Sequence, residues 1–198
     1  MTDPRSQMVE IARLIYGRCL SDSAGGNISV RQDGHVYISP RFMGSKYRYQ
    51  IGVEQISVLD GEHRVIEGPT VLSRETRMHL AVYDNFPEVG SVIHAHPRWM
   101  MVYAAAGRTM KPVLEYTDKF GDVECIPTSA AHSQALADEL VRLVMRRREQ
   151  LQKVAMGVFL PRHGVAVLGL DLDNAFDTLE RLESNARVAL LSRLLPAE

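Results

Sequence analysis

Two pairs of short alternating segments, each joined by an Asp-Gly turn, limit the fold more than any other feature of the sequence. The first pair covers residues 28–31 and 35–38 around Asp33-Gly34, and the second covers 56–59 and 64–66 around Asp60-Gly61. Asp-Gly favours the tight turn that joins two antiparallel strands, and the alternation gives each strand one core-facing side. We therefore predict antiparallel hairpins in the first third of the chain.

The later segments add helices and strands without a regular alternation of the two. Apolar spacing and end signals predict helices over 6–18, 73–85, 97–107 and 133–152, and a last one from Asp171 or Asp173 to 195. Strands are predicted over 89–96, 123–126, 158–160 and 165–168. This order predicts an α/β fold with a single central mixed, largely antiparallel sheet flanked by helices, in one domain covering residues 1–198.

Composition excludes some classes of partner. The 198 residues carry 23 basic and 24 acidic side chains, a net charge of -1, which is not typical of proteins that bind nucleic acid or acidic membranes. The sequence has no apolar run near the roughly 18 residues of a membrane-spanning helix and no apolar segment behind its first residues that would indicate a secretory signal. We expect a cytoplasmic protein whose partner is a small molecule.

Two histidines at the end of a predicted strand are the strongest candidates for a metal site. In Ser91-Val92-Ile93-His94-Ala95-His96-Pro97, the two imidazoles are two residues apart. Side chains at this spacing lie on the same face of a strand, so both can reach one divalent ion. Two histidines that only form hydrogen bonds at a strand end are the structural alternative.

Further ligands must come from other segments. Glu75 lies in the first turn of its predicted helix, and His79 follows four residues later on the same face. The two residues are therefore rival candidates for the fourth metal ligand. His163 lies in a tight turn between two predicted strands. The sequence assigns no role to the remaining histidines, His35, His63 and His132.

Three segments could bind an anion. A Gly-rich turn can present backbone N–H groups, and a helix N-terminus attracts phosphate or carboxylate. The side chains and turn residues concerned are Gly25, Gly26 and Asn27, then Ser39, Arg41 and Gly44, then Ser73 and Arg74. An ordinary turn, a solvated loop and a helix cap are the structural alternatives.

Taken together and in order, five short motifs resemble the class II aldolase/adducin family over nearly the whole chain, from about Met8 to Leu195. They are Gly25-Gly26-Asn27-Ile28-Ser29, Ile38-Ser39-Pro40, Ser73-Arg74-Glu75-Thr76-Arg77-Met78-His79, His94-Ala95-His96-Pro97 and Arg162-His163-Gly164. The resemblance implies a zinc site held by His94, His96 and His163, with Glu75 as ligand and proton acceptor. It also implies that His79 is not a ligand.

The resemblance further implies a lyase that cleaves a small ketose phosphate to dihydroxyacetone phosphate and an aldehyde through a metal-stabilised enediolate. Tyr116 and Asp118 are rivals for the second acid or base, which the family takes from a neighbouring subunit of a homotetramer. A decarboxylase, dehydratase or 4-epimerase on the same scaffold is the alternative, and an adducin-like module without catalysis is another. Glu75 favours the aldolases, because the epimerase branch carries aspartate there.

The sequence departs from the family at the phosphate pocket. Arg41 and Arg74 stand where the sugar-phosphate aldolases carry small hydroxyl residues or glycine. An arginine-rich pocket fits phosphate and also carboxylate, so the substrate is predicted only as a small anion. Three imidazoles and one carboxylate make Zn²⁺ the expected ion, with Mn²⁺, Co²⁺ and Fe²⁺ as alternatives.

Overall fold

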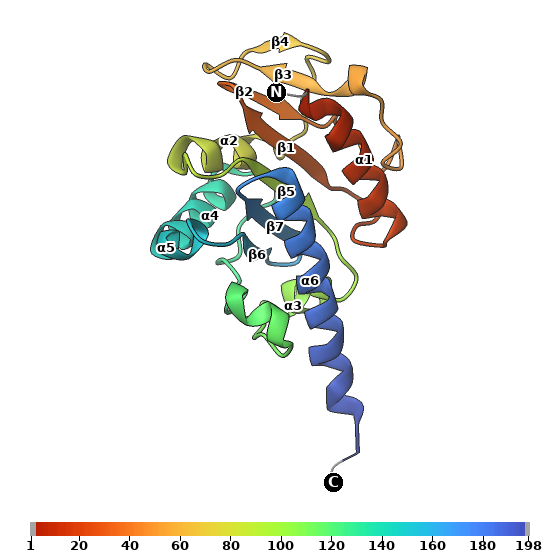
Figure 1. Cartoon of the computed structure of the whole chain (residues 1–198), viewed down its shortest axis with the longest axis vertical. Coiled ribbons are helices and arrows are strands. Elements are labelled where there is room, and N and C mark those ends of the chain that lie inside the picture. The colour runs from red at the N-terminus through yellow and green to blue at the C-terminus, as the bar shows by residue number, and fades with distance from the viewer. Residues whose placement is uncertain (1–2, 197–198) are drawn as a thin grey trace.

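One seven-stranded sheet forms the centre of the molecule, which we describe over residues 3–196 from a computed structural model (Figure 1). The strand order is β4-β3-β2-β1-β5-β7-β6, and every pairing between these strands is antiparallel. A single parallel bridge joins Cys125 to Phe159 at the β6 edge. The strands are β1 (Asn27–Gln32), β2 (His35–Ile38), β3 (Ser57–Leu59), β4 (Val65–Glu67), β5 (Ser91–Ala95), β6 (Met156–Leu160) and β7 (Gly164–Gly169). The predicted fold class is confirmed.

Helices cover both faces of this sheet, as Figure 1 shows. The helices are α1 (Pro4–Gly17), α2 (Thr76–Asn85), α3 (Met100–Ala106), α4 (Gln134–Arg146), α5 (Arg148–Leu151) and α6 (Leu172–Leu191). Alternate residues of one strand enter different cores: Ile93 and Ala95 pack with α1, α3 and α6, and Val92 packs with α2 and α4. This division follows from the period of two along a strand.

The antiparallel order brings three distant chain segments together where the strands β1, β5 and β7 end or begin, on one side of the sheet. In the β1–β5 register Asn27 lies opposite His94, and in the β5–β7 register Ala95 lies opposite Val165. Because neighbouring strands run in opposite directions, the end of β5 meets the starts of β1 and β7. The Gly25-Gly26 turn and the turn before β7 therefore both lie beside the end of β5.

Several predicted boundaries differ from the structure. The predicted helix over 133–152 is divided into α4 and α5 at Arg147, and the predicted strand over 123–126 forms only isolated bridges. The α2 helix begins at Thr76, which places Glu75 at the N-cap and not within the first turn. Residues Glu115–Phe120 form a 3-10 helix, η2, that the sequence did not predict. Short irregular segments carry weak periodicity, so tertiary contacts decide their form.

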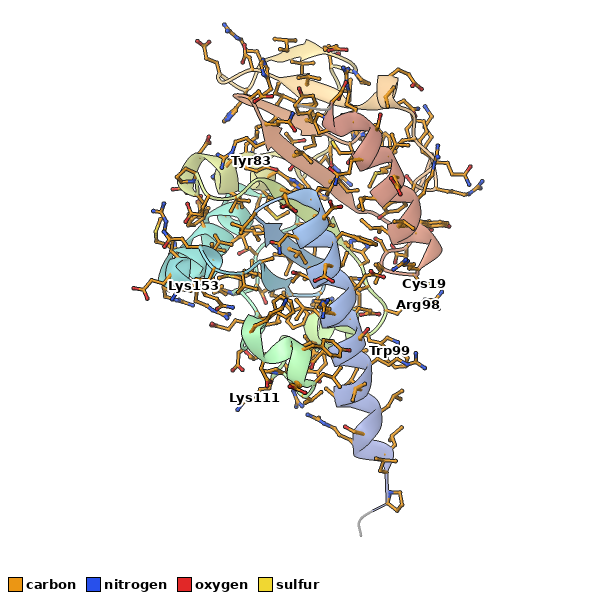
Figure 2. The ribbon with its side chains drawn as sticks, viewed as in Figure 1. Cys19, Tyr83, Arg98, Trp99, Lys111 and Lys153 are labelled. Carbon is orange, nitrogen blue, oxygen red and sulfur yellow. The ribbon has the colours of Figure 1, made fainter. Side chains whose placement is uncertain are left out.

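A buried carboxylate of α6 caps α3. Both oxygens of Glu183 accept backbone N–H groups, from Trp99 and Met100, at 2.9 Å each, and Figure 2 shows Trp99 beside α6. Glu183 is only 9% exposed, and this burial raises its pKa, although the two N–H groups oppose the shift. The carboxylate therefore replaces the side-chain cap that α3 lacks.

Glu183→Ala is expected to lower the free energy of unfolding by about 1–3 kcal/mol, because it leaves two N–H groups at the start of α3 without an acceptor. Urea denaturation followed by circular dichroism measures the change. The matched control is Glu180→Ala, on the same helix as Glu183, which removes an ion pair with the exposed Arg18 at the end of α1. Equal stability of the two variants would contradict a capping role for Glu183.

None of the helices in the described part of the chain combines the length and the apolar character needed to cross a lipid bilayer.

Candidate functional site

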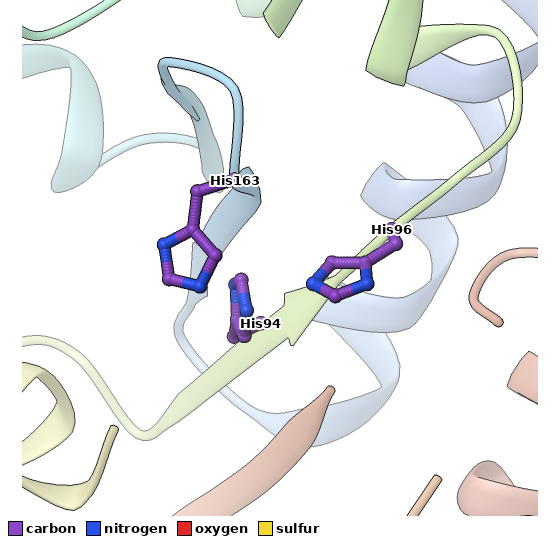
Figure 3. Close-up of side chains that lie close together, drawn as sticks. All are labelled: His94, His96 and His163. Carbon is purple, nitrogen blue, oxygen red and sulfur yellow. The ribbon is translucent and has the colours of Figure 1, made fainter. Parts of the chain in front are cut away.

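Three imidazoles lie together at the end of β5 (Figure 3). The ring centroids of His94 and His96 are 5.1 Å apart, those of His94 and His163 are 4.8 Å apart, and those of His96 and His163 are 6.1 Å apart. One ring nitrogen of each lies within 4.8 Å of the others, a spacing that could hold a metal ion. His163 joins the pair because β7, which it precedes, is antiparallel to β5.

The far nitrogens of two of these rings are held by fixed acceptors. His94 Nδ1 lies 3.1 Å from the carbonyl oxygen of Val165, and His96 Nδ1 lies 3.0 Å from Oδ1 of Asp22. Acceptors at Nδ1 fix the ring orientation and leave Nε2 as the donor atom for an ion. His96 Nε2 is buried, and none of the described residues forms a hydrogen bond with it.

Asp22→Ala is expected to lower the affinity for a divalent ion by about 10–100-fold, because the His96 ring loses the acceptor that orients it. Competition with a fluorescent chelator measures this affinity. The control is Asp138→Ala, which removes a carboxylate of α4 that is hydrogen-bonded to Gln134, and it is expected to bind the ion as tightly as the unaltered protein does. An unchanged affinity for Asp22→Ala would show that Asp22 does not orient the ring.

Glu75 lies beside the three histidines at the N-cap of α2, and it is 4% exposed. Its Oε1 is 3.3 Å from Nε2 of His163 and forms an ion-pair contact with Nδ1 of His132. Burial raises the pKa of Glu75, but contact with His163 and the nearby His94 and His132 rings outweigh it and lower the pKa to about 2. The carboxylate is therefore ionised at neutral pH and can accept a proton.

His132 is a pocket residue to which the sequence analysis assigned no role. It lines the cavity next to Glu75, and its ring meets the His163 ring edge to face at 5.6 Å between centroids. Its φ angle is +64°, a left-handed conformation that is uncommon for residues other than glycine. The one feature of the sequence that could have pointed to His132 as a pocket residue is its place directly before Ser133, the N-cap of α4.

His79 does not reach the metal site. It is fully buried, Nδ1 lies 2.7 Å from Ser29 Oγ, and Nε2 contacts the side-chain oxygen of Asn27. Burial lowers its pKa to about 4, so the ring is neutral. Both ring nitrogens are engaged, and His79 instead connects α2 to the start of β1.

The three imidazoles suit a divalent ion. One nitrogen of each lies within 4.8 Å of the others, whereas the Glu75 oxygen groups with His132 and His163 and lies 3.3 Å from Nε2 of His163. Burial lowers the pKa of His94 well below its usual value, with the neighbouring His163 and His96 rings adding to the shift, so this ring is neutral, as a ligand must be. Both carboxylate oxygens of Glu75 are buried, and among the described residues their polar contacts are those of Oε1 with His132 and His163. A buried, ionised carboxylate beside three imidazoles favours the binding of a cation.

The histidines and Glu75 line a pocket of about 230 Å³ that also has an anion-binding side. Arg41 and Arg74 line this pocket, and Nε of Arg41 is buried without a hydrogen bond to any described residue. Ser73 Oγ accepts N–H groups from Asn27 and Glu75, at 3.3 Å each, so its own O–H is free to donate. Gly25, Gly26, Asn27 and Gly44 also line the pocket.

The Gly25-Gly26 turn requires residues without a side chain. A Cβ on Gly25 would lie 2.7 Å from Cε1 of His96, and one on Gly26 would lie 1.9 Å from the Tyr49 hydroxyl. Gly26 also has a φ of +99°. Glycine at position 25 therefore lets the turn approach the His96 imidazole, and glycine at position 26 accommodates the Tyr49 hydroxyl and the left-handed backbone.

Three predicted site residues do not line this pocket. Ser39 is buried, and its hydroxyl accepts the N–H of Ile28 at 2.9 Å, so it supports the start of β1. Tyr116 and Asp118 lie on η2, which packs against α6 through a 2.9 Å hydrogen bond from Thr117 to Asn185. Tyr116 is 44% exposed, and its ring lies 5.5 Å from the guanidinium carbon of Arg181. Within one chain neither residue is part of the pocket.

Comparisons with known proteins agree with this fold. Residues 6–190 match the model of the class II aldolase and adducin N-terminal domain. The 3-oxo-tetronate 4-phosphate decarboxylase of Haemophilus influenzae is 30% identical over 95% of this chain and 88% of its own length. The L-fuculose phosphate aldolase of Methanococcus vannielii is 29% identical over 92% of this chain and 93% of its own. A solved L-fuculose 1-phosphate aldolase superposes with a TM-score of 0.84 at 24% identity, over 99% of this chain and 92% of that one. The chain therefore belongs to the family of class II aldolase and adducin N-terminal domains, whose members include aldolases and decarboxylases.

Proposed function

We propose that this protein is a metal-dependent class II aldolase, a carbon–carbon lyase that cleaves a small ketose phosphate to dihydroxyacetone phosphate and an aldehyde. The observation that carries the proposal is the cluster of His94, His96 and His163 beside the ionised carboxylate of Glu75. The same pocket carries the two arginines, which suit a phosphate. A Zn²⁺ ion held by the three histidines would polarise the substrate carbonyl, and Mn²⁺, Co²⁺ or Fe²⁺ could serve in its place.

The residues of the chain divide the remaining work. Arg41, Arg74 and the Ser73 hydroxyl bind the phosphate and orient the ketose. In the cleavage direction, one carbon of the ketose becomes the carbonyl carbon of the aldehyde. A base accepts the proton of the hydroxyl group on this carbon, and the carbon–carbon bond next to it breaks. The proton released from that hydroxyl returns through solvent to the Glu75 carboxylate, which transfers it to the carbon next to the carbonyl; in the reverse direction Glu75 removes a proton from that carbon.

The base at the leaving oxygen is proposed to come from a second copy of the chain. Tyr116 and Asp118 lie on the outside of η2 and not in their own pocket, which is consistent with a homotetramer whose active sites lie between subunits. Tyr116 and Asp118 are rivals for this role. Cross-linking with mass spectrometry between η2 and the pocket residues of isotope-labelled chains would test the arrangement.

A metal-dependent decarboxylase is the second candidate, and one feature favours it. The pocket presents the guanidinium groups of Arg41 and Arg74, so it could hold a carboxylate as well as a phosphate. The curated relative from Haemophilus influenzae, named a decarboxylase, has the highest identity of those compared above. Glu75 in place of aspartate disfavours the 4-epimerase alternative, and an adducin-like module would need no metal.

A substrate screen on protein loaded with Zn²⁺ separates these candidates. Ketose 1-phosphates are assayed for dihydroxyacetone phosphate by coupled oxidation of NADH, and phosphorylated 3-oxo acids are assayed for carbon dioxide. The proposal expects the first product and not the second. Carbon dioxide release would support the decarboxylase, and protein that binds no metal would support the non-catalytic module.

Arg41→Ala is expected to raise KM for the anionic substrate about 10–100-fold with little change in kcat. The reason is that the lost charge-assisted contact stabilises the bound substrate and the transition state equally. Steady-state kinetics measure both constants. Arg13→Ala, which removes an exposed arginine of α1, is the control and is expected to leave KM unchanged. A lower kcat at constant KM would instead place Arg41 at the reacting atoms.

A further inference from the structure

The buried carboxylate of Glu75 lies between two groups of donors. One group is His94, His96 and His163, and the other is Glu75, His132 and His163, so that only His163 is common to both. Within the second group, Oε1 of Glu75 contacts Nδ1 of His132. In this structure the carboxylate is therefore held on the side of the pocket where His132 lies.

His132 is fixed in this place by its neighbours. Its side chain is 29% exposed, whereas that of Glu75 is 4% exposed, so His132 lies nearer the opening of the pocket. The residue precedes the N-cap of α4, and α4 packs against α2, which begins directly after Glu75. The edge-to-face contact with His163 further limits the ring. The position of the imidazole relative to Glu75 thus depends on the packing of two helices.

We propose that His132 is a positioning residue that holds the Glu75 carboxylate away from the metal ion, so that Glu75 exchanges between a metal-bound and a His132-bound position. The inference rests on the proposed metal site. A substrate that binds the ion needs the coordination position that Glu75 occupies, and Glu75 must then be free to move a proton. Contact with His132 stabilises the buried carboxylate in that displaced position, where the other imidazole near Oε1 is that of His163, at 3.3 Å.

The proposal predicts the sign of an effect on metal affinity. The two positions of Glu75 compete, so removing one of them favours the other. Loss of the His132 imidazole is therefore expected to raise metal affinity, by about 3–10-fold for one partly exposed polar contact. If His132 were itself a metal ligand, its removal would lower the metal affinity.

The test titrates metal-free protein with Co²⁺ and follows the visible absorption of the bound ion. His132→Gly removes the imidazole and suits the left-handed backbone at this residue. His132→Asn keeps an N–H donor near the Nδ1 position and tolerates the same backbone. His63→Gly is the matched control, because His63 also has a positive φ, of +62°, and an ion pair with a carboxylate, Asp84, but does not line the pocket.

The expected result is a higher Co²⁺ affinity for His132→Gly, with His132→Asn and His63→Gly close to the unchanged protein. In a Glu75→Ala background, His132→Gly is expected to have no further effect, because His132 acts only through Glu75. A lower affinity for His132→Gly in either background would make His132 a ligand, and an unchanged affinity for His132→Gly in the protein that retains Glu75 would make His132 a passive neighbour. Either result overturns the proposal.

A second readout uses acetohydroxamate, a bidentate ligand that occupies two positions on a bound ion and so displaces Glu75. Its affinity for the Co²⁺-loaded protein is expected to fall in His132→Gly by the factor by which the Co²⁺ affinity rises, since both report the same equilibrium of Glu75. Equal hydroxamate affinities would contradict the exchange. Unchanged protein that binds no Co²⁺ would refute the metal site itself, which distinguishes failure of the proposed function from failure of this inference alone.

Discussion

Glu75→Gln is expected to lower kcat by about 10²–10⁴-fold, the usual contribution of a general acid or base, while the protein keeps most of its metal. Glutamine has the size of glutamate and keeps one oxygen, but it cannot accept a proton. In this protein the carboxylate is ionised, because the contact with His163 and the nearby imidazoles outweigh its burial and lower its pKa to about 2. The substitution therefore removes the proton acceptor while the three imidazoles remain.

The measurement combines single-turnover kinetics with metal analysis of the same samples. Glu75→Asp is the companion variant, because it keeps the charge on a shorter side chain and is expected to retain more activity than Glu75→Gln. If the metal content of Glu75→Gln fell by the same factor as its activity, Glu75 would be a ligand only, and the proposed proton transfer would be wrong.

His94→Ala is expected to lower the affinity for Zn²⁺ by more than about 100-fold, because even residues that merely orient a ligand contribute about 10–100-fold. His94 is 2% exposed at the end of β5, and the carbonyl of Val165 fixes its Nδ1, so the substitution removes an imidazole that is held in one orientation. Turnover is expected to fall to the level of the metal-free protein.

Thermal unfolding with and without Zn²⁺ gives an independent measure of the same loss. A ligand at 100 times its Kd stabilises the folded state by about 2.7 kcal/mol, so the unchanged protein is expected to melt at a higher temperature with Zn²⁺. His94→Ala is expected to show no such rise in melting temperature. The control is His35→Ala, which changes a residue beside the β1–β2 turn and is expected to show the same rise as the unaltered protein. An equal increase for both variants would place the ion elsewhere.

Local sequence signals predicted most of the regular structure. The alternation around Asp33-Gly34 and Asp60-Gly61 predicted the hairpins β1–β2 and β3–β4, and their antiparallel pairing is confirmed. Asp171, one of the two residues predicted to begin the last helix, is its N-cap and accepts the backbone N–H of Asn174. These features depend on residues close together in the chain, so the sequence carries them directly.

The pairing of His94 with His96 could also be expected from the sequence, since residues two apart share a strand face. The approach of His163 depends on a different kind of information. It requires that β7 lie next to β5 and run antiparallel to it, and no residue near either strand specifies that pairing. The family motifs implied it, but the periodicity of the sequence did not.

The sequence by itself determined the helices, the hairpins and the residue types available for a metal and an anion. Only the tertiary structure decided which of them meet. It turned both nitrogens of His79 toward Ser29 and Asn27, buried the Ser39 hydroxyl under the Ile28 N–H, and placed His132 against Glu75. These contacts join residues 11 to 57 positions apart along the chain. Their energies depend on packing between elements, which a pattern of neighbouring residues does not encode.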